Sequence, residues 1–264
     1  MDERNDYLSV GSATIILSVY LLITITCDCI LVLLGSIFNI SPNNPGIYSM
    51  ETILSFFILL NYLKNENMGV NLKIFFYYDK KIIHYLFPLT IIIGSSFIII
   101  VRIENLVLTF IPMKEEIKVL FENLFGGNIS LLGSLIGGVL VASIVEECLF
   151  RGIILNGFLK KYDPPKAIFY STGIFTLFHL NPWQLIAPFT LGIILSICFY
   201  KTKSLYVCVY GHSLYNLISI LYVRINKNHS FGKIVNIPLW IYLLAILLFL
   251  IGVIIGNRVL KGKI

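Results

Sequence analysis

Charged residues are scarce in this chain of 264 residues: 13% of them are charged, whereas 57% are hydrophobic. A soluble domain carries about 25% charged residues, so this chain cannot cover a water-exposed surface. The mean hydropathy is +0.87, and several apolar runs reach the roughly 20 residues that a helix needs to cross a bilayer. The composition therefore excludes a soluble enzyme, a disordered protein and a disulfide-stapled secreted domain. It predicts a protein embedded in a lipid bilayer.

Several sequence signatures of ligand binding are also missing. The chain has no glycine-rich nucleotide loop, no cysteine framework for zinc and no basic tract interleaved with aromatic residues. No nucleic-acid partner is therefore expected, and the net charge of +6 is attributed to cytoplasmic loops rich in Lys and Arg. The cysteines all lie in apolar stretches, where they are expected to behave as small hydrophobic residues: Cys27, Cys29, Cys148, Cys198 and Cys208.

Hydropathy and helix breakers predict an all-α, polytopic membrane helix bundle with a polar intramembrane cavity. About eight membrane helices are expected, at 10–37, 49–63, 82–101, 130–158, 164–180, 183–200, 204–222 and 236–257. The division predicted from this pattern is an N-terminal helical region, a catalytic core and a C-terminal helix, at 1–125, 126–225 and 226–264.

Local signals add detail to these spans. The first apolar run lacks a small-residue cleavage pattern and is expected to be an uncleaved anchor. A polar turn cluster at 39–46 ends that run, and an amphipathic segment at 113–125 is expected to lie at the membrane interface. Asp163 is the predicted N-cap of a helix that starts at Pro164. Gly133 and Gly137 form a GxxxG pattern, which permits close helix approach.

The distribution of Lys and Arg predicts the orientation. With the N-terminus in the cytoplasm and eight alternating spans, 13 of the 20 Lys and Arg residues fall on the cytoplasmic side and six on the outer side. The remaining one, Arg151, lies within a span. This bias predicts a multi-pass protein of the cell membrane with both termini in the cytoplasm.

Ionisable residues within membrane spans are costly and are candidates for function. Five of the seven found here, and the amide of Asn216, lie in the fourth, fifth and seventh spans; the seven are Asp28, Glu51, Glu146, Glu147, Arg151, His179 and His212. Asp28 is expected to neutralise a neighbouring helix or to face a water-filled cavity. Glu51, near the end of its span, is expected to be hydrated.

Counting from the flanking lysines places three polar residues at a common depth. Each lies 13 or 14 residues from a cytoplasmic lysine: Glu146 from Lys160, His179 from Lys166 and Asn216 from Lys203. At about 1.5 Å per residue, this is roughly 20 Å along each helix. Three spans are therefore expected to bring an acid, two imidazoles and an amide to one region, because His212 shares a face with Asn216.

The helical step separates the two adjacent glutamates. Glu147 and Arg151 are four residues apart, share a face and are expected to form an intramembrane ion pair. Glu146 lies about 140° away from Arg151 around a helix of 3.6 residues per turn. Its carboxylate is therefore expected to be left out of that pair. Phe175, four residues before His179, is expected to serve packing.

These residue types suit hydrolysis of an amide bond. A desolvated carboxylate is a competent general base near neutral pH, and a nearby imidazole can hold the attacking water or move its proton. A second imidazole and an amide can donate hydrogen bonds to the oxyanion that forms on the attacked carbonyl. Cys148 and Ser213 are near in sequence, but neither is placed as a nucleophile. The economical interpretation is attack by water.

Three motifs carry a family resemblance. Residues Glu146-Glu147-Cys148-Leu149-Phe150-Arg151 match EExxxR, Phe175–His179 match FxxxH, and His212–Asn216 match HxxxN. Each motif alone is weak, but the three in this order are specific. Over about residues 130–222 the chain resembles the CPBP family of intramembrane endopeptidases, which comprises CAAX proteases and bacteriocin-processing enzymes and is also called Abi.

The resemblance implies roles for the motif residues. Glu146 would activate water with His179 as its partner, His212 and Asn216 would stabilise the oxyanion, and Glu147 and Arg151 would support the site. It implies a glutamate-type mechanism without a cofactor. Zinc stays open as an alternative at this stage, because one carboxylate and two imidazoles also make a zinc ligand set, although HExxH is absent.

The expected partners are the lipid bilayer and a peptide or membrane-protein substrate. A composition rich in Ile, Asn and Lys suggests a low-GC bacterium, where prenylated proteins are not expected. The family resemblance then implies processing of a bacteriocin or signalling-peptide precursor, or self-immunity against a bacteriocin. One alternative is a non-proteolytic regulator that binds a partner membrane protein. Another is a secondary transporter with a Glu/His proton relay, against which stands the lack of an inverted repeat.

Overall fold

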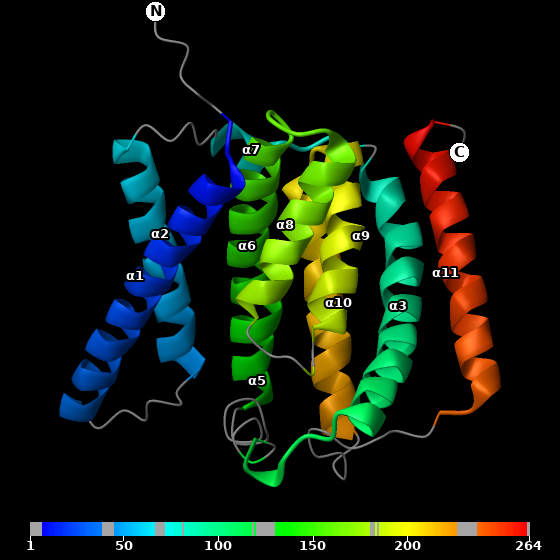
Figure 1. The fold of residues 1–264 in the computed structure, drawn as a ribbon, viewed down its shortest axis with the longest axis horizontal. Helices are drawn as coiled ribbons and strands as arrows, with labels where there is room; N and C mark the ends of the chain where they lie inside the picture. The colour runs from blue at the N-terminus through cyan, green and yellow to red at the C-terminus, as the bar shows by residue number, and fades with distance from the viewer. Residues whose placement is uncertain are drawn as a thin grey trace, which may run out of the picture. The chain divides into compact units, whose positions relative to one another are not determined.

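The computed structural model describes residues 7–38, 45–66, 72–80, 82–117, 119, 130–179, 183, 185–225 and 237–262. Within these ranges the chain is helical and contains no strand, which confirms the predicted all-α bundle. The longer helices (Figure 1) are α1 (Val10–Ile37), α2 (Pro45–Asn65), α3 (Ile82–Phe110), α8 (Pro164–Phe178), α9 (Ile186–Thr202), α10 (Leu205–Ile225) and α11 (Leu239–Leu260). A short 3₁₀ helix, η1, covers Leu72–Phe76.

Five of these helices are long and apolar enough to cross a membrane: α1, α2, α3, α10 and α11. Helix α9 is apolar but shorter. A multi-pass helical membrane protein is therefore shown, and each of the eight predicted ranges contains helix, while the number of eight spans stays a prediction.

Helix α3 continues to Phe110 instead of ending near residue 101 as predicted. The sequence places Arg102 and Glu104 there, and these charges suggest a helix end. In the structure the Arg102 guanidinium lies over the Tyr242 ring of α11, 5.4 Å from its centroid. A cation over an aromatic face is stabilised, so the charge can be accommodated without ending the helix.

The stretch from 131 to 158 is one continuous helical path with two π-helical segments. It consists of α5 (Leu131–Ser134), η2 (Leu135–Val141), α6 (Ala142–Glu147), η3 (Cys148–Leu155) and α7 (Asn156–Phe158). The Asn156 N–H donates to the Arg151 carbonyl, five residues back. The regular helical step assumed from the sequence is therefore wrong here. Such π-helical segments are rare and frequently occur at functional sites.

The chain forms two compact units, Met1–Tyr77 with Ile129–Ser171, and Tyr78–Asn128 with Thr172–Ile264. These units are defined by packing, and the functional division into 1–125, 126–225 and 226–264 stays a prediction. The predicted turn cluster at 39–46 lies mostly outside the described residues. Of the predicted interfacial segment 113–125, the described part is 113–117 and 119, with helical backbone at 115–117 and 119.

In the first unit, α1 packs against α2 (Figure 1). Helix α2 also packs against η2 and α6. Gly137 allows this approach, because a Cβ added there would lie 3.2 Å from the Ser49 hydroxyl oxygen and 3.6 Å from the Tyr48 ring. The second glycine of the predicted GxxxG pattern thus faces α2. This close contact brings residues of α2 near the helix that carries the EExxxR motif.

The segment before α1 docks on the end of that same helix. Leu8 is 8% exposed, and its N–H donates to the Gly157 carbonyl at 3.2 Å. A Cβ added to Gly157 would lie 2.6 Å from Leu8 side-chain carbons. The absence of a side chain at Gly157 is therefore what lets the N-terminal segment pack here.

We expect Gly157→Ala to lower thermal stability in detergent, by about 1–3 kcal/mol in unfolding free energy, because the new methyl overpacks the Leu8 contact. Gly94→Ala in α3 is the matched control, since a Cβ there meets nothing within 4 Å. Alanine favours a helix over glycine, so the control should melt at the same temperature as the wild type or higher. Equal melting temperatures for Gly157→Ala and the wild type would contradict the close-packing argument.

In the second unit, α3 and α11 run side by side, and α10 packs against α3 and α9 (Figure 1). A Cβ added to Gly252 of α11 would lie 2.9 Å from Ile92 of α3. On α10, a Cβ at Gly211 would lie 2.8 Å from Leu195 and 3.3 Å from Leu89. Gly211 directly precedes His212, so close packing holds the backbone of the HxxxN motif against two neighbouring helices.

Candidate active site

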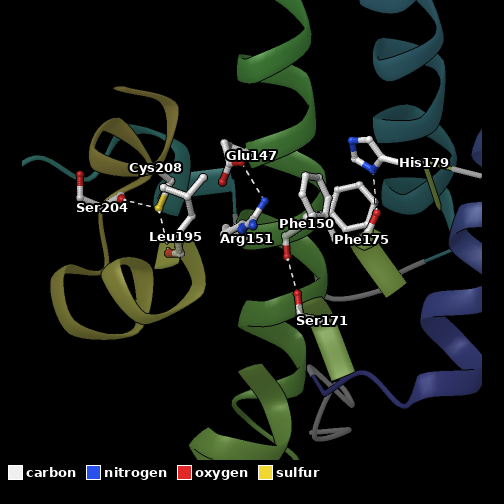
Figure 2. Close-up of polar contacts among 9 residues, drawn as sticks. All are labelled: Glu147, Phe150, Arg151, Ser171, Phe175, His179, Leu195, Ser204 and Cys208. Atoms are coloured by element: carbon white, nitrogen blue, oxygen red, sulfur yellow. Dashed lines mark hydrogen bonds and ion pairs between the residues drawn. The ribbon is translucent and has the colours of Figure 1, made fainter. Parts of the chain in front are cut away.

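The second glutamate of the EExxxR motif is engaged in a buried ion pair. Arg151 Nη1 donates to Glu147 Oε1 at 2.7 Å, and the two side chains are 1% and 0% exposed (Figure 2). The ion pair predicted from the four-residue spacing is thus confirmed. Separation of a buried ion pair is strongly unfavourable, because each charge would then be buried without an opposite charge beside it. Glu147 and Arg151 therefore anchor the motif helix.

Glu146 occupies a different environment, although it is the next residue along α6. Its side chain is partly exposed, whereas Glu147 is fully buried. The Glu146 carboxylate interacts electrostatically with the hydroxyls of Tyr20 in α1 and Tyr48 in α2. The partial exposure belongs to the residue as a whole, since its Oε2 atom is buried. A general base must be reachable by water, and of the two motif glutamates only Glu146 has any exposed surface.

His179 lies just after the last turn of α8, and its ring is fixed by the backbone. Its Nδ1 lies 2.9 Å from the Phe175 carbonyl oxygen (Figure 2). A carbonyl oxygen can only accept, so Nδ1 carries the proton in this hydrogen bond. In the neutral ring Nε2 is then the acceptor, which is the form needed to take a proton from water.

The Phe175 ring lies beside the imidazoles of His179 and His212, two histidines of the second unit. Its centroid is 4.7 Å from that of His179 and 6.1 Å from that of His212, with edge-on geometry in both cases. Phe175 is 1% exposed, and α9 approaches it at Gly192, where a Cβ would lie 3.4 Å from the ring. The expected packing role is confirmed, and the structure adds that this ring packs against two motif histidines.

The HxxxN motif lies on α10. His212 is 4% exposed, and Asn216 is partly exposed one turn further along the same face. His179, His212 and Asn216 belong to the second unit, and Glu146, Glu147 and Arg151 belong to the first. The cavity that Glu146 is expected to share with the histidines and Asn216 therefore stays a prediction, as do the catalytic roles.

Glu51 does not lie in the environment expected from the sequence. The prediction of a hydrated carboxylate is wrong, because Glu51 is 5% exposed. Helix α2 begins at Pro45, so Glu51 lies within it and not at its end. Its carboxylate accepts from Ser55 Oγ at 2.9 Å and from Thr52 Oγ1 at 3.4 Å. Asp28 is exposed on α1 and interacts electrostatically with Glu51, and its function stays a prediction.

The sequence interpretation missed further polar groups. Glu104 of α3 has one carboxylate oxygen that is buried and has no hydrogen-bond partner within the described residues, and it interacts electrostatically with Tyr215. Glu104 was not among the candidates, because α3 was expected to end near residue 101 and Glu104 therefore to lie outside the span. Tyr20 and Tyr48 were missed because tyrosines are common at membrane interfaces. No local sequence pattern marks these residues, because their interaction partners lie on helices that are far away in the sequence.

The described segments hold neither a cluster of metal ligands nor a disulfide. No three His, Cys, Asp or Glu side chains there are grouped so that they could hold a metal ion. All five cysteines are free thiols, and Cys27, Cys198 and Cys208 are buried. Cys208 Sγ lies 3.5 Å from the carbonyl oxygens of Leu195 and Ser204, typical of a packed thiol (Figure 2).

Comparison with known proteins gives one family match. Residues 128–218 match the model of the family described as type II CAAX prenyl endopeptidase Rce1-like. The matched range is about a third of the chain and contains all three motifs. No curated protein and no solved structure matches the chain. Together with the long apolar helices, the match supports a multi-pass intramembrane protease of the CAAX type in general terms. Over residues 128–218 the chain is thus similar to the Rce1-like family of type II CAAX prenyl endopeptidases, which confirms the resemblance indicated by its three motifs.

Proposed function

We propose that this protein is an intramembrane endopeptidase that hydrolyses a peptide bond with water activated by Glu146. The observation that carries the proposal is the contrast between the two motif glutamates. Glu147 is fully buried against Arg151, whereas Glu146 is partly exposed and interacts electrostatically with the Tyr20 and Tyr48 hydroxyls. The family match over 128–218 supports a peptidase in general, and this contrast favours Glu146 as the base.

In the proposed reaction, the Glu146 carboxylate takes a proton from water, and the resulting hydroxide attacks the carbonyl carbon of the scissile bond. His212 and the Asn216 amide donate hydrogen bonds to the oxyanion. The C–N bond then breaks as the proton passes to the leaving amine, so that one water yields a carboxylate and an amine. His179 is the partner in proton transfer, and its Nδ1–H bond to the Phe175 carbonyl orients Nε2 for that task.

The proposed substrate is a membrane-associated peptide or protein, namely a bacteriocin or signalling-peptide precursor, or a bacteriocin in self-immunity. The matched family is named for prenyl endopeptidases. The composition rich in Ile, Asn and Lys favours a low-GC bacterium, where prenylated proteins are not expected. For this reason the proposal extends the peptidase chemistry to unprenylated peptides.

The proposal is tested by complementation of a null strain with wild type, Glu146→Gln and His179→Ala at equal membrane abundance. Mass spectrometry then compares the membrane and secreted peptides of the three strains. We expect both variants to fail and one peptide to accumulate uncleaved, which identifies the substrate. Full complementation by both variants, with no accumulated peptide, would refute proteolysis and favour a non-proteolytic regulator that binds a membrane partner.

A glutamate-type mechanism also predicts insensitivity to chelators. The rate of peptide cleavage by the purified protein in liposomes should stay the same after treatment with 1,10-phenanthroline and dialysis. If cleavage is lost and zinc restores it, the mechanism uses a metal, and the ligands to test are Glu146, His179 and His212.

A further inference from the structure

Basic side chains of the second unit gather where helices α9 and α11 end. The Lys201 ammonium, in the last turn of α9, donates to Asn257 Oδ1 of α11 at 2.7 Å. Arg258 directly follows Asn257 in the last turn of α11, and Lys261 is the C-cap residue of that helix. All three basic side chains are exposed. The hydrogen bond therefore holds a cation of α9 beside the end of α11, which carries two more.

A buried contact with α3 fixes the two helix ends. The Tyr85 hydroxyl lies 3.5 Å from Cys198 Sγ of α9, and a Cβ added to Gly256 of α11 would lie 2.9 Å from the Tyr85 ring. Cys198 comes three residues before Lys201, and Gly256 directly precedes Asn257. The close approach of Lys201 to α11 is therefore supported by helix packing directly beneath it.

Positive charge dominates this end of the second unit. Helices α9, α10 and α11 contain no Asp or Glu. Helix α3 begins at the same end, because Tyr85 of its first turn contacts α11 (Figure 1). There Asp79 is followed directly by Lys80 and Lys81. Basic clusters on the cytoplasmic side of a membrane attract anionic phospholipids, and basic pockets between membrane helices bind their headgroups.

An apolar stripe on α11 leads to the basic residues. Leu247, Ile251 and Ile254 are large apolar side chains that are exposed. Together with Arg258 they are spaced by four, three and four residues, so they lie along one face of the helix. An acyl chain can lie along such a stripe, whereas a free phosphate ion gains nothing from it. A stripe that ends in basic residues therefore favours a phospholipid over free phosphate.

We propose that the ends of α9 and α11 form a binding site for an anionic phospholipid of the surrounding bilayer. Lys201, Arg258 and Lys261 donate charge-assisted hydrogen bonds to the headgroup phosphate. Asn257 holds Lys201 in position, and an acyl chain lies along the apolar stripe on α11. The site lies apart from the three motifs and does not depend on the proposed peptidase activity. It gives a role to α11, which lies outside the matched range 128–218.

The first test measures lipid binding to the detergent-purified protein by native mass spectrometry, with phosphatidylglycerol and phosphatidylcholine as probes. The wild type should retain phosphatidylglycerol and not phosphatidylcholine, and inorganic phosphate should not displace the bound lipid. The triple variant Lys201→Gln/Arg258→Gln/Lys261→Gln should bind phosphatidylglycerol about 10²-fold more weakly, because each basic residue near a membrane surface contributes about fivefold in affinity. Wild-type affinity in this variant would refute the site, and displacement by phosphate would show that the site takes free phosphate instead.

The triple variant Lys160→Gln/Lys161→Gln/Lys166→Gln is the matched control. It removes the same number of exposed positive charges from the first unit, on the same predicted side of the membrane. A ligand that binds the folded state raises the melting temperature. Phosphatidylglycerol should therefore raise it for the wild type and the control but not for the site variant. Equal loss of lipid binding in both triple variants would refute a defined site, because binding would then follow net charge alone.

Asn257→Ala tests whether the arrangement matters as well as the charge. It leaves every charge in place and removes only the oxygen that accepts from Lys201. We expect phosphatidylglycerol to bind about fivefold more weakly, the contribution of one basic residue. Wild-type affinity would refute the role of Asn257 in positioning Lys201. None of these measurements uses peptide cleavage, so failure of the proposed function would leave their results unchanged.

Discussion

Replacement of Glu146 by Gln is expected to lower kcat for peptide cleavage by about 10²–10⁴-fold, the contribution of a positioned general base. The amide has the size of the carboxylate but cannot take a proton from water. KM and the melting temperature should stay close to wild type, because Glu146 is partly exposed and lies outside the ion pair between Glu147 and Arg151. The measurement is the initial rate in liposomes at several substrate concentrations.

Glu66→Gln is a matched control for this experiment. Glu66 is exposed just after the end of α2, so loss of its charge should leave kcat and KM unchanged. Loss of a general base lowers the rate by about 10²-fold or more. If Glu146→Gln retains more than about a tenth of the wild-type kcat, Glu146 is therefore not the base. The same loss in both variants would point to a general effect of charge on membrane insertion.

The largest effect on stability is expected for Arg151→Met. The substitution keeps a long apolar side chain but leaves the Glu147 carboxylate buried without its partner, 0% exposed. Loss of one member of a buried ion pair costs about 3–5 kcal/mol. We expect this decrease in unfolding free energy in denaturant titrations of the detergent-solubilised protein, and a lower yield of folded protein in membranes.

The double variant Glu147→Gln/Arg151→Met separates the charge effect from the packing effect. Without either charge, nothing is left uncompensated, and replacement of a whole buried pair by neutral groups is often tolerated. The double variant should therefore be more stable than Arg151→Met alone. If both variants are equally unstable, the loss comes from the packing of Arg151 and not from its charge.

Local patterns in the sequence were enough for the fold class and for part of the site. Scarce charge and long apolar runs predict membrane helices because the cost of burying polar groups in lipid applies to every segment separately. The ion pair between Glu147 and Arg151 is equally local, because residues four apart on a helix face each other. The three motifs lie within the matched range 128–218, so the family resemblance was also readable from short stretches.

Predictions that assumed regular geometry fared less well. The segment Cys148–Leu155 is π-helical, so the angle computed between Glu146 and Arg151 for an α-helix does not apply. Helix α3 runs past its two charges to Phe110, and a carboxylate of that segment, Glu104, was therefore overlooked. Hydropathy describes only how apolar each segment is. It does not report which backbone groups are hydrogen-bonded, as in the π-helical segment, or whether an aromatic ring stabilises a charge, as Tyr242 does for Arg102.

Tertiary structure decided the surroundings of each functional side chain. Glu51 is buried and hydrogen-bonded, Phe175 packs against two imidazoles, and Tyr20 interacts electrostatically with Glu146 from a helix more than a hundred positions away. None of this follows from composition or spacing, because burial and electrostatic partners depend on which helix faces pack together. The sequence by itself determined that this protein is a helical membrane protein with an EExxxR, FxxxH and HxxxN core. Only the packing of distant helices, at close contacts such as Gly137 and Gly192, decided what each of those residues touches.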